Sequence, residues 1–143
     1  MKVKPIPYEK RTVFPSTGTG DLGFITEEIA ATINVRAGPI KLLNGVEGRA
    51  GGFGRRHIEA HASRMKQIYG LGYKDVITYV QNVVASFDRI ATQENGRILI
   101  LSYKNNLHHH VICQWDDDIS AWSVTTAIPK STVRNANIVW ERK

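Results

Sequence analysis

The spacing of hydrophobic residues changes from a helical to a strand-like period near Phe87, and this change constrains the fold more than any other feature. Between Lys74 and Phe87 the apolar side chains recur at helical spacing, which predicts a helix over this segment. After Phe87 the pattern alternates in short runs, and Asn95-Gly96 predicts a hairpin turn between the first two of them. The predicted strands are 89–93, 97–104, 108–115 and 121–128.

The residues before Lys74 are predicted to be mainly helical. Apolar residues at helical spacing predict a helix over 21–33. Residues 34–43 are predicted to form a strand, which Gly38-Pro39 would make bulged or place at a sheet edge. The glycine-rich segment 44–54 is expected to be a loop, and the helix after it should stop near Gly70. This order predicts an α+β fold, with N-terminal helices packed on one face of a four- to five-stranded antiparallel sheet.

Composition limits the domain organisation and the partners. Residues 1–20 are rich in Pro, Lys, Thr and Gly and are expected to be a flexible arm or linker, leaving 21–143 as a single domain. The net charge of +6 favours a polyanionic partner, such as nucleic acid, an anionic membrane or an acidic protein. No run of apolar residues approaches the roughly 18 of a membrane span. A single cysteine, Cys113, excludes an internal disulfide and a cysteine-based zinc site.

A glycine turn at Gly51-Gly52 leads into the segment that carries the chemistry. At roughly 100° per residue, His57, His61 and Arg64 fall on one stripe of a continuous helix. Imidazole is suited to moving protons near neutral pH, and guanidinium is suited to gripping a phosphate. Backbone N–H groups in the first turn of this helix would also favour a nearby phosphate. The pattern therefore predicts cleavage of a phosphodiester.

Several short segments occur in an order that resembles a known family. They are Ala37-Gly38-Pro39-Ile40, Gly52-Phe53-Gly54-Arg55-Arg56-His57-Ile58 with His61, Gly72-Tyr73, Asn95-Gly96-Arg97 and Trp122-Ser123-Val124-Thr125-Thr126-Ala127. Together, over about residues 34–130, they resemble the barnase/EndoU/colicin/RelE-like ribonuclease superfamily. The resemblance is to its phage-associated and polymorphic-toxin branches, including ribonuclease toxin domains of contact-dependent growth inhibition.

This resemblance implies a fold, an activity and a setting. The family packs helices on a four-stranded antiparallel sheet, and its members mostly cleave RNA, often tRNA, without a metal or other cofactor. The resemblance also implies a toxin that acts in the cytoplasm of a target bacterial cell, delivered as part of a larger secreted or phage-associated protein. A producing cell would then need an immunity protein, which we expect to be acidic and to cover the basic cleft.

Metal-free RNA cleavage needs a base for the 2′-hydroxyl, an acid for the departing 5′-oxygen and cations around the phosphorane. His57 and His61 are the candidate proton carriers, and the sequence leaves open which is the acid and which the base. The resemblance adds Thr126 as a hydroxyl donor to the phosphate. Strand alternation groups Thr126 with Trp122 and Val124, and groups Ser123, Thr125 and Ala127 on the other face.

The remaining candidates would bind substrate. Arg56, Arg64 and Lys104 are candidate phosphate ligands because their charges lie on the histidine segment or end a predicted strand. Trp122 is a candidate for stacking on an exposed base.

Two other functions stay open at this point. The first is a non-catalytic RNA-binding domain, or a nuclease-like domain that has lost its activity. The second is a metal-dependent hydrolase that uses His57 and His61 with the run His108–His110. Consecutive strand histidines alternate faces, so at most two of the run converge, and two imidazoles without a carboxylate make a poor metal site. We therefore expect no metal and no cofactor.

Overall fold

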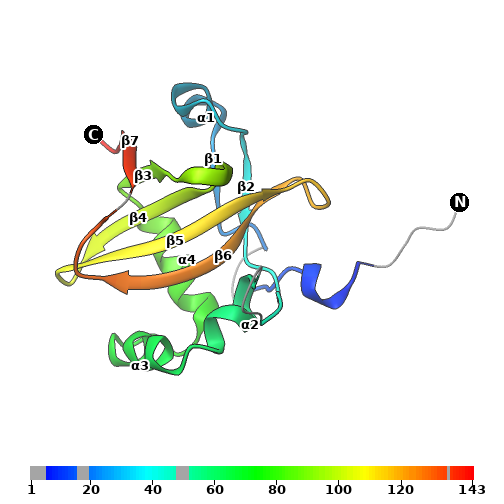
Figure 1. The fold of residues 1–143 in the computed structure, drawn as a ribbon, viewed down its shortest axis with the longest axis vertical. Helices are drawn as coiled ribbons and strands as arrows, with labels where there is room; N and C mark the ends of the chain where they lie inside the picture. Colours follow the sequence, from blue (N-terminus) through cyan, green and yellow to red (C-terminus); the bar gives the residue numbers. More distant parts are fainter. Residues whose placement is uncertain (1–5, 16–19, 48–51, 135) are drawn as a thin grey trace, which may run out of the picture.

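A seven-stranded mixed sheet organises the chain (Figure 1). The structure is a computed structural model that describes residues 6–15, 20–47, 52–134 and 136–143; parts of the expected arm and of the glycine loop lie outside these ranges. The sheet has the strand order β1-β2-β6-β5-β4-β3-β7. The strands are β1 (Gly23–Ile25), β2 (Gly38–Lys41), β3 (Arg89–Thr92), β4 (Ile98–Lys104), β5 (Leu107–Asp116), β6 (Ala121–Lys130) and β7 (Asn137–Glu141). The helices are α1 (Glu27–Ile33), α2 (Gly54–Glu59), α3 (Ala62–Gly70) and α4 (Val76–Ser86), with short 3-10 turns η1 (Tyr8–Lys10) and η2 (Glu94–Gly96).

The prediction of a four- to five-stranded antiparallel sheet is wrong. β2 pairs with β6 in parallel, with Ile40 opposite Trp122, and β1 and β7 extend the sheet at its two ends. The expected helix over 21–33 divides into β1 and α1, because the Thr26 side chain caps α1 by accepting from the backbone of Ile29. β2 is also not an edge strand, since it lies between β1 and β6.

The second half of the chain follows the sequence pattern closely. The predicted helix over 74–87 is confirmed as α4, and the four predicted strands are confirmed as β3 to β6. Asn95 and Gly96 both have positive φ, of 66° and 75°, as a tight turn between β3 and β4 requires. The segment 132–140, which the sequence left open, contributes β7, and β7 pairs with β3.

The main core lies between the helices and one face of the sheet. Buried residues of α2, α3 and α4, among them Ile58, Ile68 and Val80, join buried residues of β4 to β6 in one cluster. The opposite face carries a smaller cluster around Leu99 and Leu101. β1 and β7 are at opposite ends of the strand order, yet α1, which directly follows β1 in the chain, contacts β7. The sheet therefore curls. No helix in the described part of the chain has the length and apolar character needed to cross a membrane.

The exposed flank of β6 and a bulge in it determine where the site forms. β6 pairs with β5 along its length but with β2 only at Trp122 and Ser123, and α2 and α3 both contact β6. In the register with β5, Thr126 lies opposite Ile112 and Val124 opposite Cys113, which leaves Thr125 as the extra residue of a bulge.

The bulge also changes which β6 side chains share a face. Val124 and Ala127, three positions apart, both join the main core. The predicted alternation, which put Ala127 on the face opposite Val124, is therefore wrong beyond the bulge.

Candidate functional site

His57 and His61 lie together, although the helix predicted to carry both is broken. α2 ends at Glu59, and His61 has extended backbone angles (φ −94°, ψ 93°) as the residue that precedes α3. The break lets both short helices contact β6. The two imidazole rings still meet edge to face, with their centroids 5.1 Å apart. The prediction of one continuous helix is wrong, but the two histidines remain adjacent.

Arg64 completes the group from the first turn of α3. Its Nη1 donates a hydrogen bond to Oγ1 of Thr126 on β6, at 2.6 Å. Its Nε is buried without a hydrogen-bond partner, and no described carboxylate forms an ion pair with the guanidinium. Burial lowers the pKa of Arg64, but a guanidinium still carries its charge at neutral pH. A half-buried cation with an unused donor is suited to binding an anion.

Beneath Arg64, a buried pair of side chains supports the site. The Tyr79 hydroxyl of α4 and Nδ1 of His109 on β5 are 2.8 Å apart. His109 Nε2 faces the carbonyl oxygen of Lys104 at 3.1 Å, and a carbonyl only accepts, so Nε2 is the donor. Burial lowers the pKa of His109, so its ring is neutral near pH 7 and its Nδ1 accepts from Tyr79. Tyr79 also interacts electrostatically with Arg64.

The surroundings of His57 favour it as a proton acceptor. Burial lowers the pKa of His57 below its ordinary value of 6.5, and the charges of His61 and Arg64 lower it further. The carboxylate of Glu47 acts in the opposite direction. An imidazole with a lowered pKa is neutral at pH 7 and can take up a proton. These surroundings make His57 the candidate for a proton acceptor, a choice that the sequence left open.

Two expectations for the start of α2 are not met. The first-turn backbone N–H groups of Arg55 and Arg56 donate to the carbonyl oxygens of Leu43 and Asn44, so they are not free for a phosphate. The exposed guanidinium of Arg56 lies 6.0 Å from the ring centroid of Tyr8, and no described contact joins it to His57. The structure therefore does not bring Arg56 into the group around Arg64.

Lys104 and Trp122 lie elsewhere. Lys104 is exposed at the end of β4, beside the two-residue turn to β5, and no described contact joins its side chain to His57 or His61. Trp122 is 3% exposed, donates its indole N–H to the carbonyl oxygen of Arg36, and packs edge to face on Trp115. The Trp122 side chain points from β6 into the core, so its indole ring has no exposed face on which a base could stack.

The histidine run on β5 does not join this site as a group. His109 faces α4, whereas His108 lies opposite Tyr103 and 2.9 Å from Arg89 on the other face of the sheet. Within the described ranges, no group of three or more His, Cys, Asp or Glu side chains is placed to hold a metal ion. The structure gives no geometry for the metal-dependent alternative.

Sequence reasoning missed Tyr79 because its spacing placed this residue on the apolar face of α4, and the structure shows it fully buried there. The signal that was available is its polar tip, since a buried tyrosine hydroxyl usually has a hydrogen-bond partner. Sequence reasoning also missed Arg97 and Gln114, which line a pocket on the opposite face of the sheet. Nothing in their local pattern distinguishes them from other exposed strand residues.

We expect the protein to lose stability as the pH falls from about 7.5 to about 5.5. Burial lowers the pKa values of His57, His109 and His110 in the folded protein below 6.5. Above 6.5 these rings are neutral in both states, and below it the unfolded chain takes up protons first, which favours unfolding. Urea unfolding at the two pH values measures the difference, and equal midpoints would contradict this expectation.

The geometry thus joins two imidazoles, a guanidinium that has no described carboxylate partner, and the hydroxyl that this guanidinium binds on β6. Comparisons of the chain with protein-family models, with curated proteins and with solved structures found no match.

Proposed function

We propose that this protein is a metal-independent endoribonuclease. His57 removes the proton from a ribose 2′-hydroxyl, and the 2′-oxygen attacks the adjacent phosphorus. The bond from phosphorus to the 5′-oxygen breaks, and His61 donates a proton to that oxygen. Arg64 and Thr126 bind the phosphate oxygens as their charge grows. The products are a 2′,3′-cyclic phosphate and a 5′-hydroxyl.

The observation that carries this proposal is the guanidinium of Arg64. Leaving a buried donor without a partner costs about 1–3 kcal/mol. The Nε of Arg64 is such a donor, and no described carboxylate compensates the charge. A bound phosphate would supply the missing negative charge, and a small turn of the side chain would bring Nε to it as a donor. The two histidines beside Arg64 supply the proton transfers that a phosphodiester needs.

We propose tRNA as the substrate and a toxin as the biological role, on the strength of the sequence resemblance. In this role the protein acts in the cytoplasm of a target bacterial cell, after delivery as part of a larger secreted or phage-associated protein. The net charge of +6 supports a polyanionic substrate. The same charge supports an acidic immunity protein that blocks the site in a producing cell.

Replacing Arg64 with alanine is expected to slow RNA cleavage about a hundredfold, because the phosphorane loses its main cation. The measurement incubates total bacterial RNA with the protein in EDTA and analyses the fragment ends. Lys66 provides a matched control, since it lies on the same helix but is exposed. Lys66→Ala removes an equal charge and should keep nearly full activity.

Three outcomes would contradict the proposal. Intact RNA in EDTA together with cleavage on adding a divalent metal would indicate a metal-dependent hydrolase. RNA that binds but stays intact under both conditions would indicate a non-catalytic RNA-binding or degenerate domain. Equal losses for Arg64→Ala and Lys66→Ala would show that only the net charge matters.

A further inference from the structure

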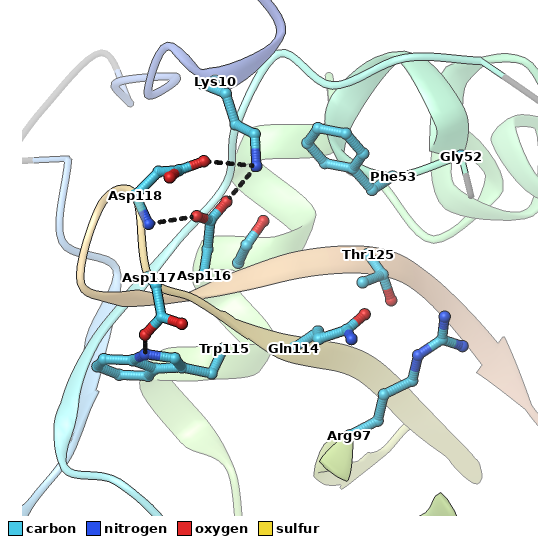
Figure 2. A pocket seen from close by; sticks show the side chains of 11 residues that line it. Lys10, Gly52, Phe53, Arg97, Gln114, Trp115, Asp116, Asp117, Asp118 and Thr125 are labelled. Carbon is cyan, nitrogen blue, oxygen red and sulfur yellow. Dashed lines mark hydrogen bonds and ion pairs between the residues drawn. The ribbon is translucent and has the colours of Figure 1, made fainter. Parts of the chain in front are cut away.

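Thr125, the neighbour of Thr126 on β6, lines a second hollow in the structure. A pocket of about 300 Å³ opens there, lined mainly by β5, β6 and the turn between them, and closed by Lys10, Phe53 and Arg97 (Figure 2). This volume is at the low end of the range for small-molecule sites. The pocket therefore suits a small group better than a large ligand.

Each carboxylate on the acidic side of this pocket lies within 4 Å of a cation. Lys10 Nζ lies 2.6 Å from the Asp116 carboxylate and 3.7 Å from that of Asp118. Asp117 accepts from Arg36 and from the indole N–H of Trp115, each at 2.9 Å. Figure 2 shows these carboxylates gathered around Lys10 and Trp115, away from Thr125. The acids therefore shape the wall of the pocket and are not free to hold a cation.

The opposite side presents polar groups that the protein does not use. The Gln114 amide and the Arg97 guanidinium make no side-chain hydrogen bond or ion pair with any described residue, and both are exposed. Figure 2 shows both side chains on the side of the sheet where Thr125 lies. The Oγ1 of Thr125 donates to the carbonyl oxygen of Ile112 at 3.1 Å, so it can still accept. These groups offer donors and acceptors to a ligand in the pocket.

Two segments of chain link the pocket to the candidate active site. Phe53 lines the pocket and immediately precedes α2, which carries His57. The bulge in β6 directs Thr125 into the pocket while its neighbour Thr126 receives the hydrogen bond from Arg64. The pocket and the group around Arg64 are therefore joined through adjacent residues of β6.

We propose that this pocket binds the purine base of a nucleotide next to the phosphate that is cleaved. An amide such as Gln114 forms two hydrogen bonds with N6 and N7 of adenine, and a guanidinium such as Arg97 forms two with O6 and N7 of guanine. The ring of Phe53, with Lys10 Nζ 5.4 Å from its centroid, supplies an aromatic wall of the kind on which RNA bases stack. The position beside the phosphate rests on the proposed ribonuclease function, whereas base binding does not.

The experiment titrates the protein with the four nucleoside 3′-monophosphates and follows the tryptophan indole N–H signals by NMR. The Trp115 signal should move because this side chain lines the pocket, while the Trp140 signal on β7 serves as an internal reference. Adenosine and guanosine nucleotides should bind most tightly. Gln114→Leu should weaken the adenosine nucleotide about tenfold, and Gln67→Leu, on the exposed side of α3, should leave its affinity unchanged.

The outcomes separate the two proposals. Equal movement of the Trp115 and Trp140 signals, unchanged affinity in Gln114→Leu, or tighter binding of pyrimidine nucleotides would overturn the base pocket. Each of these results would leave RNA cleavage by the protein untouched. Purine binding by a protein that cleaves no RNA would support the pocket and overturn the ribonuclease. If both proposals hold, Gln114→Leu should relax the base preference of the cleavage sites mapped on a mixed-sequence RNA.

Discussion

Replacing His57 with alanine is expected to lower RNA cleavage about a thousandfold, the largest effect of any single change in the site. The ring of His57 lies against His61 and near the Arg64 charge, and burial and those charges lower its pKa. Without it the arrangement lacks the imidazole proposed to accept the 2′-hydroxyl proton, and His61 is needed for the departing oxygen. Cleavage rates on a defined RNA in EDTA, with circular dichroism to check folding, measure the loss.

His108 provides the matched control for this change. It lies on the opposite face of the sheet, beside Tyr103 and Arg89, so His108→Ala should cleave at nearly the normal rate. In the unaltered protein, kcat/KM should fall in acid with a midpoint below 6.5, because the pKa of His57 is lowered and only its neutral form accepts a proton. Equal activity of the two alanine variants would exclude His57 as the base.

Replacing Gly45 with alanine is expected to destabilise the fold by about 3 kcal/mol, a large part of the stability of a small domain. Gly45 has φ +75°, which L side chains rarely adopt, and an added Cβ would overlap the carbonyl oxygen of Phe53. Because Phe53 leads into α2, the backbone shift that relieves this overlap would also move His57. We expect both a lower urea midpoint and slower cleavage.

Gly96 separates the two causes of this effect. It has the same φ of +75°, but a Cβ there would meet nothing within 4 Å. Gly96→Ala should therefore lose only about 1 kcal/mol, from the backbone conformation alone. If Gly45→Ala lowers the free energy of unfolding no more than Gly96→Ala does, the backbone at Phe53 moves aside easily and the prediction is wrong.

The parts of the fold that could be predicted are those where local pattern and tertiary contacts agree. α4 has a regular apolar face, and the Asp75 side chain before it accepts a hydrogen bond from the backbone of Thr78. Both the helical spacing and the start of the helix can therefore be predicted from nearby residues. The hairpins around Asn95 and Asn105 follow from residues that tolerate positive φ. The parallel pairing of β2 with β6 has no such signal, because it depends on contacts between distant segments.

The candidate site was predictable to the extent that it depends on neighbours in sequence. His57, His61 and Arg64 were found because they are close along the chain, and their grouping survives the break between α2 and α3. Lys104 and Trp122 were misplaced because strand position alone does not say what covers a residue. The bulge at Thr125 was invisible for the same reason, since a bulge is a property of the pairing of β5 with β6.

The parallel junction between β2 and β6 also determines when, during synthesis, the site can exist. Parallel neighbours need a long crossover, and here α2, α3, α4 and the intervening strands all lie within it. His57 and Arg64 therefore leave the ribosome well before Thr126, the residue that receives the hydrogen bond from Arg64. A nascent chain holds only scattered parts of the cluster until β6 emerges and docks beside β2. If the protein is the proposed ribonuclease, it would thus stay inactive while it is still attached to the ribosome, which is itself largely RNA.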